Sequence, residues 1–165
     1  MYDICCIGHI TSDKVVTPER TVFLPGGTSV YFSNAIAKMN VRYALVTSLA
    51  DKEIRFAKDL SDKGIEVKVF PSAHTVYFEN MYSGNKDHRV QRVPQKADPF
   101  ALYEVDNIDA RVFHLGSLLA DDFSLDIIKA LSQKADVSLD VQGFLRKVEG
   151  ENLIPCNWKE KMDAP

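Results

Sequence analysis

Two adjacent glycines, Gly26 and Gly27, stand directly before residues 28–39, which have the pattern of an amphipathic helix with Thr28 or Ser29 as its N-cap. Glycine lets the backbone approach a ligand closely, and the start of a helix offers unpaired N–H groups and the positive end of its dipole. This arrangement suits a hydroxyl-rich or anionic small molecule. A tight turn before a helix is the alternative interpretation.

Further polar residues follow the expected strands. Asp13 stands in the loop after the strand at 2–8, Gly116 and Ser117 follow the strand at 110–115, and Asp140, Gln142 and Arg146 follow the strand at 137–141. Ligands of open α/β sheets bind beyond the carboxyl ends of the strands. A carboxylate such as Asp13 can accept two hydrogen bonds from neighbouring hydroxyls of a polyol. Read by its position alone, Asp13 is equally a solvated loop residue or a cap.

A pair of aromatic and β-branched segments, 74–82 and 88–93, is typical of a hairpin, with the turn at 83–85. Glu79 and Asn80 lie in its first strand, and Arg89 and Gln91 lie in its second. One face of such a hairpin could cover a pocket and turn polar groups into it. The alternative is an exposed face of an accessory sheet. His114, on an apolar strand, is typical of a core histidine.

Strands and helices alternate along the rest of the chain. Apolar segments predict strands at 2–8, 42–48, 65–70, 110–115 and 137–141, and helices at 28–39, 52–63 and 123–134, with short strands at 15–16 and 21–24. The loop at 94–100 leads from the hairpin back to the main sheet. We therefore expect one α/β domain over 1–165, with an open, mainly parallel sheet flanked by helices and a small accessory β lid formed by strands around 14–25 and 74–93.

Composition excludes several functional classes. The chain has 165 residues, is 45% hydrophobic and 26% charged, and carries a net charge of −3 without a basic stripe, so no nucleic-acid partner is expected. No apolar run reaches the ~20 residues of a membrane helix. Three cysteines without metal-ligand spacing, and an N-terminus that reads as a strand, favour a cytoplasmic protein. The four scattered histidines predict no metal site, and no dinucleotide or P-loop motif occurs.

Taken in order, these segments resemble the N-terminal part of the ribokinase-like carbohydrate kinases, the PfkB family. The resemblance rests on residues 8–13, on Pro25-Gly26-Gly27 and the helix after it, on residues 78–80 and 89–91, and on the strand ends at 114–116 and 138–146. Members transfer a phosphoryl group from ATP, with Mg²⁺, to a hydroxymethyl group of a sugar, nucleoside or similar polyol. The resemblance implies a substrate-binding set of Asp13, Gly26, Gly27, Thr28, Tyr31, Glu79 and Asn80, with Arg89, Gln91 and Asp140 as further candidates.

Two departures from the family pattern shape the expectation. Tyr31 stands where many members carry an asparagine that contacts the sugar, which disfavours simple ribose as the substrate. The family's Gly-Ala-Gly-Asp segment, with its catalytic aspartate, has no counterpart, and the string Asn157-Trp158-Lys159-Glu160 only partly resembles the family's magnesium motif. We therefore expect the C-terminal half of the fold to be absent, no catalytic residue within this chain, no ATP or Mg²⁺ bound by it, and an isolated chain that is inactive.

A different class of function also fits the sequence. The chain could be a non-catalytic module that binds a polyol or dimerises. An incomplete sheet leaves apolar surface and unpaired backbone groups exposed, so a homodimer through the lid strands or the sheet edge is expected. A nicotinamide-binding fold is a weaker alternative, because its glycine fingerprint is missing.

Overall fold

The computed structural model describes residues 1–84 and 89–156. The predicted turn at 83–85 falls partly outside this range, and the string at 157–160 and the expected start of a helix at 158–162 fall wholly outside it.

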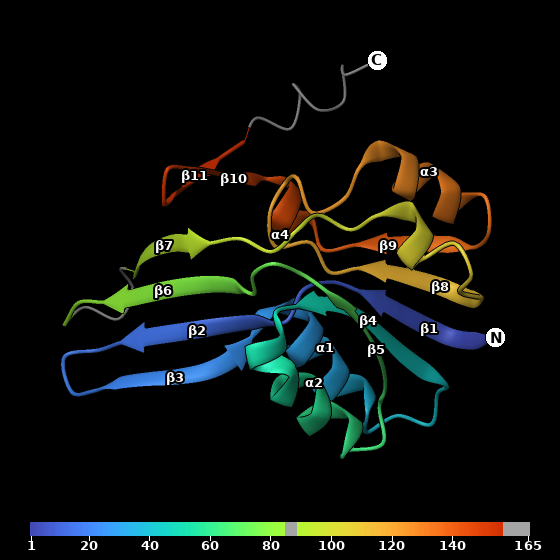
Figure 1. Ribbon diagram of the computed structural model, residues 1–165, viewed down its shortest axis with the longest axis horizontal. Coiled ribbons are helices and arrows are strands. Elements are labelled where there is room, and N and C mark those ends of the chain that lie inside the picture. Colours follow the sequence, from blue (N-terminus) through green and yellow to red (C-terminus); the bar gives the residue numbers. More distant parts are fainter. Residues whose placement is uncertain (85–88, 157–165) are drawn as a thin grey trace.

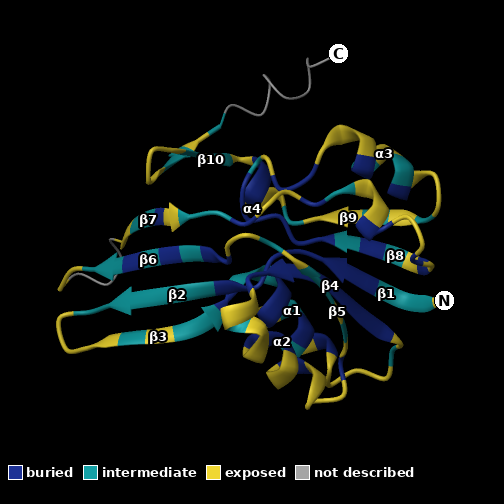
Figure 2. Ribbon diagram, in the orientation of Figure 1, coloured by how far each residue is buried: buried dark blue, intermediate teal, exposed yellow. Residues whose placement is uncertain are grey.

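The first sheet is parallel throughout and has the strand order β5-β4-β1-β8-β9. Its strands are β1 (Tyr2–Ile7), β4 (Tyr43–Leu49), β5 (Glu66–Pro71), β8 (Ala110–Leu115) and β9 (Asp136–Leu139). All seven residues of the interior strand β4 are buried, as expected for an apolar run covered on both faces (Figure 2). The predicted open, mainly parallel α/β sheet is confirmed.

Helices cover both faces of this sheet (Figure 1). On one side lie α1 (Gly27–Ile36) and α2 (Ile54–Ser61), the latter preceded by a 3-10 turn at Asp51–Glu53. On the other side lie α3 (Leu125–Ser132) and the segment around a second 3-10 turn at Leu102–Glu104. Cys5 and Cys6 are both buried but belong to opposite cores, because neighbouring residues of a strand point to opposite faces.

A second, mixed sheet extends from the carboxyl-end side of the first and has the order β10-β11-β7-β6-β2-β3 (Figure 1). Its strands are β2 (Thr11–Val16), β3 (Thr21–Gly26), β6 (Val76–Tyr82), β7 (Arg89–Gln95), β10 (Arg146–Glu149) and β11 (Asn152–Pro155). Strand β2 runs parallel to β6, and the other neighbouring pairs are antiparallel. The hairpin of β10 and β11, which follows the one-turn helix α4 (Val141–Phe144), was not expected from the sequence.

Two local expectations were wrong. Asp13 lies within β2 and not in a loop, because β2 pairs with β3 over its whole length, from Thr11 opposite Gly26 onward. The N-cap of α1 is Gly26, and neither Thr28 nor Ser29 caps the helix. The Thr28 hydroxyl instead donates a hydrogen bond to Asp140, which lies far away in the sequence, so a contact between elements displaces the local cap.

Candidate functional site

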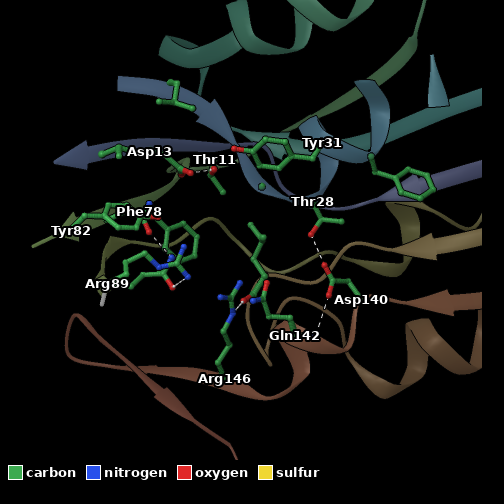
Figure 3. Close-up of a pocket in the computed structure, with 17 residues that line it drawn as sticks. Thr11, Asp13, Thr28, Tyr31, Phe78, Tyr82, Arg89, Asp140, Gln142 and Arg146 are labelled. Carbon is green, nitrogen blue, oxygen red and sulfur yellow. Dashed lines mark hydrogen bonds between the residues drawn. The ribbon is translucent and has the colours of Figure 1, made fainter. Parts of the chain in front are cut away.

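A cavity of about 440 Å³ lies between the second sheet and the loops at the carboxyl ends of the first sheet (Figure 3). Strands β2, β3, β6 and β7 contribute to it, together with the start of α1 and the turn before α4. Eight of the ten residues named as candidates line it: Asp13, Gly27, Thr28, Tyr31, Asn80, Arg89, Gln91 and Asp140. The structure thus brings together residues that are as much as 127 positions apart in the sequence, from Asp13 to Asp140.

Asp13 has one carboxylate oxygen engaged and the other directed along the glycine pair. The Thr11 hydroxyl donates a hydrogen bond of 2.6 Å to Asp13 Oδ1. Burial raises the pKa of the Asp13 carboxyl, although the Thr11 hydrogen bond and the charge of Arg89 act in the opposite direction. A half-buried carboxylate with a spare oxygen is suited to accept hydrogen bonds from hydroxyl groups.

Close packing requires both glycines, Gly26 against Asp13 and Gly27 against His9. A β-carbon at Gly26 would lie 2.4 Å from Asp13 Oδ2. At Gly27, where φ is +85°, a β-carbon would lie 2.7 Å from the carbonyl oxygen of His9. The Gly26 contact places Asp13 directly against the diglycine turn. Gly26 packs against the Asp13 carboxylate and is not among the residues that line the cavity.

Asn80 is 5% exposed and is held in a fixed orientation by its cross-strand partner. The side-chain amide of Gln91 donates a hydrogen bond of 2.8 Å to Asn80 Oδ1. With Asn80 Oδ1 accepting from Gln91, the NH₂ group is the part of the Asn80 amide that can donate at the cavity wall.

Thr28 and Asp140 join the start of α1 to the end of the last parallel strand. The Thr28 hydroxyl donates a 2.7 Å hydrogen bond to Asp140 Oδ2, and the Gln142 backbone N–H donates to Asp140 Oδ1 at 3.1 Å. Asp140 is therefore committed as a local acceptor that also caps α4. Tyr31, 62% exposed, stands at the rim of the cavity (Figure 3).

The structure does not bring Glu79 to the cavity. Side chains alternate along β6, so Phe78 and Asn80 face the cavity while Glu79 faces the opposite side of the sheet. There the Lys14 ammonium donates to Glu79 Oε1 at 3.1 Å, and Arg92 lies 3.7 Å from Glu79 Oε2. The expectation that Glu79 and Asn80 share one site therefore needs correction, since adjacent strand residues cannot face the same pocket.

Several cavity residues were not among the sequence candidates: Thr11, Phe78, Leu118, Gln142 and Arg146. Gln142 and Arg146 were visible as polar residues after a strand end, and Thr11 has the same parity as Asp13 along β2. Phe78 and Leu118 are apolar, and their residue type alone does not distinguish them from core residues. His114, expected to be a core histidine, is only half-buried; its ring stacks on Phe32 with centroids 4.3 Å apart, and its Nδ1 lies 2.7 Å from Ser138 Oγ.

Another hollow, of about 580 Å³, lies beside Tyr2, Ala44 and Glu66, where strands of the first sheet begin. Because ligands of open α/β sheets bind at the carboxyl ends, this position does not favour a substrate site. Within residues 1–84 and 89–156, no group of three or more His, Cys, Asp or Glu side chains could hold a metal ion. Over the same residues, no helix is long and apolar enough to cross a membrane.

Comparison with solved structures finds close matches in one fold. A pyrophosphate-dependent kinase in the ribokinase family, complexed with a pyrophosphate analog and myo-inositol, matches with a TM-score of 0.87 and 28% identity over 96% of this chain and 56% of that chain. A pyrophosphate-dependent myo-inositol-1 kinase converted into a myo-inositol-3 kinase matches with a TM-score of 0.84 and 26% identity, over 96% and 54% of the two chains.

A more distant match shows the fold alone. Adenosine kinase from Sinorhizobium meliloti has a TM-score of 0.65 and 14% identity, over 84% of this chain and 56% of that chain. No family model and no curated protein matches the sequence. The chain spans little more than half the length of these solved structures. The fold is ribokinase-like, and the resemblance to the carbohydrate kinases of that family, which the ordered motifs indicate, is confirmed.

Proposed function

We propose that this chain forms the acceptor-binding part of a ribokinase-family kinase and that its substrate is a polyol. The observation that carries the proposal is the convergence of Asp13, the diglycine turn and Asn80 on one cavity. A volume of about 440 Å³ lies in the range of small-molecule sites. A neighbouring pair of hydroxyls would bind the free oxygen of Asp13, and a third oxygen would accept from the amide of Asn80.

A cyclic polyol of the myo-inositol type fits this wall better than a simple ribose. Phe78 and Leu118 supply apolar surface for the C–H face of a ring, while Asp13 and Asn80 supply polar groups for its rim. Tyr31 narrows the entrance with a phenol ring. The similar kinase that was solved with myo-inositol supports the same substrate class.

In the proposed reaction these residues orient the acceptor hydroxyl for attack on a phosphoryl donor. Phosphoryl transfer depends mainly on positioning and on stabilisation of charge at the phosphoryl group. The family resemblance implies ATP with Mg²⁺ as the donor, whereas the similar kinases use pyrophosphate. Because the catalytic Gly-Ala-Gly-Asp segment does not occur in these 165 residues, we propose that the chain binds the acceptor but does not transfer phosphate by itself.

Binding is tested by thermal unfolding of the chain with myo-inositol, ribose and adenosine, each titrated to millimolar concentration. A ligand at 100 times its dissociation constant stabilises the folded state by about 2.7 kcal/mol, which raises the melting temperature by roughly 5–10 °C in a chain of this size. We expect a rise with myo-inositol and a smaller one with ribose. Absence of any rise across a panel of cyclic and linear polyols would contradict the proposal.

Catalysis is tested separately. The chain is incubated with myo-inositol and either ATP with Mg²⁺ or pyrophosphate with Mg²⁺, and the product is followed by phosphorus NMR. We expect binding without formation of a phosphate ester. Turnover by the purified chain would show that it contains a complete catalytic site and would overturn this part of the proposal.

A further inference from the structure

A buried histidine lies next to the cavity without lining it. His9 stands between β1 and β2, where it is 0% exposed, and it is not among the residues of the cavity wall. Its ring stacks on Phe100, with centroids 4.4 Å apart and planes 20° from parallel. In the part of the chain that the structure describes, His9 Nε2 is buried without a hydrogen-bond partner. Such an atom needs an explanation, because no hydrogen bond offsets the cost of removing it from water.

Both nitrogens of the His9 ring face oxygen atoms that can only accept hydrogen bonds. Nδ1 lies 3.3 Å from the carbonyl oxygen of Ser48 in β4. Nε2 lies 3.9 Å from Asp122 Oδ1, which is within the range of an ion pair but too long for a hydrogen bond. A neutral imidazole carries a proton on one nitrogen only, so either tautomer leaves a lone pair facing an acceptor. Only the imidazolium, with a proton on each nitrogen, directs a donor at both oxygens.

Asp122 is suited to be the negative partner of this ring. It is 5% exposed, and its Oδ2 accepts hydrogen bonds from the backbone N–H groups of Leu118 at 2.7 Å and Leu119 at 3.0 Å. Two N–H donors stabilise an ionised carboxylate, and they leave Oδ1 for His9. The stacked Phe100 ring also favours a positive charge on His9, because the face of an aromatic ring attracts a cation.

The other charged group that acts on His9 is already engaged elsewhere. Asp98, in the segment after β7, accepts hydrogen bonds from the Ala73 N–H and the Ser72 hydroxyl. These bonds lower the pKa of the Asp98 carboxyl, and the charges of His74 and His9 lower it further. Asp98 is exposed, so Asp122 is the buried counter-charge of His9. The groups of β4 and α1 that contact His9, the Ser48 carbonyl and the Gly27 backbone, are uncharged.

Each member of the pair holds one part of the cavity wall. The carbonyl oxygen of His9 packs against Gly27, where an added β-carbon would lie 2.7 Å from it. Asp122 holds the backbone of Leu118. The same β-carbon at Gly27 would lie 3.5 Å from Leu118 Cδ1, so these two wall residues are neighbours. Attraction between His9 and Asp122 therefore draws together the segment after β1 and the turn after β8, and with them two parts of the wall.

We propose that His9 is a buried imidazolium and that its ion pair with Asp122 positions Gly27 and Leu118 for binding of the polyol. The inference rests on the proposed function and deepens it, since it names positioning residues of the same site. Both residues act through backbone that lines the cavity, and neither lines it itself. Without the second proton, Nε2 would direct a lone pair at Asp122 Oδ1, and the two segments would be pushed apart.

The charge state is tested by nitrogen NMR of the His9 ring in the full chain at neutral pH, with the signals assigned by their loss in His9→Gln. We expect both ring nitrogens of the wild-type chain to carry a proton. In Asp122→Asn, the amide oxygen can still accept from Leu118 and Leu119 while its NH₂ group faces Nε2. His9 should then become neutral, with its proton on Nδ1. A wild-type ring with only one protonated nitrogen would overturn the proposal.

Positioning is tested by calorimetric titration of myo-inositol into Asp122→Ala, Asp122→Asn and the control Asp121→Ala. Asp121 is the adjacent carboxylate, exposed and paired with Lys96. Asp122→Ala should weaken binding about tenfold or more, because two buried N–H groups and the imidazolium lose their partner. Asp122→Asn should fall between Asp122→Ala and wild type, and Asp121→Ala should stay within about twofold of wild type. Binding by Asp122→Ala that equals wild type would overturn the positioning role.

Thermal melting checks the folding of each variant. If Asp122→Ala does not fold, the ring spectra of the wild-type chain and of Asp122→Asn still decide the charge state, and the affinity of Asp122→Asn against that of Asp121→Ala decides the positioning role. An affinity of Asp122→Asn no weaker than that of Asp121→Ala would then overturn it.

Failure of the proposed function gives a different result. In that case myo-inositol would not bind to the wild-type chain, but the ring spectrum needs no ligand. The backbone amide signal of Gly27, which belongs to a different element from Asp122, reports the wall of the free chain. We expect this signal to move in Asp122→Ala and to stay in place in Asp121→Ala. An unmoved Gly27 signal would overturn the positioning role whether or not a polyol binds.

Discussion

At the scale of single residues, Asp13 is the centre of the proposed site. Its environment combines a hydrogen bond from Thr11, close contact with the backbone of Gly26 and enough burial to raise the pKa of its carboxyl. The residue type and its place after a strand made Asp13 a candidate from the sequence. Its burial and its hydrogen bond could not be predicted, because they depend on the pairing of β2 with β3.

We predict that Asp13→Asn weakens binding of myo-inositol by about 10- to 100-fold without lowering the stability of the fold. Hydrogen bonds to a charged group contribute about 1.5–3 kcal/mol, and the amide loses one acceptor and the charge. Stability should not fall, because the change removes a partly desolvated charge. Calorimetric titration and thermal melting measure the two effects.

The matched control is Glu79→Gln, the same chemical change on the neighbouring strand but on the opposite face of the sheet. It should leave the affinity for myo-inositol within about twofold of wild type, since a partly exposed charge on the face away from the cavity contributes little to binding. An equal loss of affinity in both variants would indicate an indirect effect of charge and would contradict a direct contact between Asp13 and the ligand.

The raised pKa of Asp13 leads to a second prediction, on pH. Binding needs the ionised carboxylate, so affinity for myo-inositol should fall on acidification at a higher pH than the ordinary value of 3.8 would give. Folding behaves in the opposite direction, because a carboxyl whose pKa is raised in the folded state gains stability as it is protonated. Titration of binding between pH 7 and 4 should show this fall in the wild-type chain and a flat profile in Asp13→Asn.

At the scale of elements, the start of α1 shows how contacts between elements override local rules. Thr28 has the chemistry of an N-cap, yet its hydroxyl binds Asp140, and Gly26 takes the cap position with no side chain to contribute. The hydrogen bond joins a helix to a turn that lies 112 residues later. Single-sequence rules describe propensities within one element, so they could not identify this partner.

We predict that Gly27→Ala destabilises the chain more than Gly64→Ala. Both glycines have positive φ, +85° and +84°, so both substitutions carry the same left-handed strain of about 1–2 kcal/mol. Only at Gly27 does the new methyl group also meet backbone, the carbonyl oxygen of His9 at 2.7 Å, whereas Gly64 has nothing within 4 Å. Chemical denaturation measures the difference, and equal losses would show that the backbone at Gly27 relaxes freely.

Strands β1, β4 and β8 could be predicted from the sequence because they are apolar runs, and β6 because its apolar residues alternate. The hairpin of β10 and β11 could not, although residues 146–155 alternate around Gly150, where φ is +61°. Its strands are short and carry few large apolar side chains. Arg146, which opens β10, was visible only as a polar residue after a strand end, and its approach to Leu118 depends on this hairpin.

At the scale of the whole molecule, the second sheet has two different faces. One lines the cavity with Asp13 and Asn80. The other, which we call the outer face, carries the linked charges of Lys14, Glu79 and Arg92 together with the exposed apolar residues Phe23 and Val90, which are 68% and 62% exposed. Contiguous exposed apolar surface rimmed by polar residues marks a contact site for another protein.

We predict self-association of the chain through this outer face. The double variant Phe23→Ser, Val90→Ser should weaken the dimer at least tenfold in sedimentation equilibrium, because about 1.5–3 kcal/mol accompanies burial of each large apolar side chain. The control is Tyr103→Ser. Tyr103 is 70% exposed, lies beside β5 of the first sheet and is not part of the outer face, so its substitution should not change the apparent molecular mass. A wild-type chain that is monomeric at all concentrations would refute the prediction.

The alternation along β6 has a consequence for how such a protein can change over evolutionary time. Even-numbered positions 76, 78 and 80 are buried on the cavity side, and odd-numbered positions 77 and 79 are only partly covered on the other. A substitution at an even-numbered position leaves the contacts of the odd-numbered side chains in place, and the reverse also holds. The reason is that the β6 backbone stays paired with β7 and β2 in either case. Related proteins can therefore change the ligand that the cavity binds without changing the outer face. They can equally change the outer face, and any protein that it contacts, without changing the cavity, although the residues concerned are adjacent in the sequence.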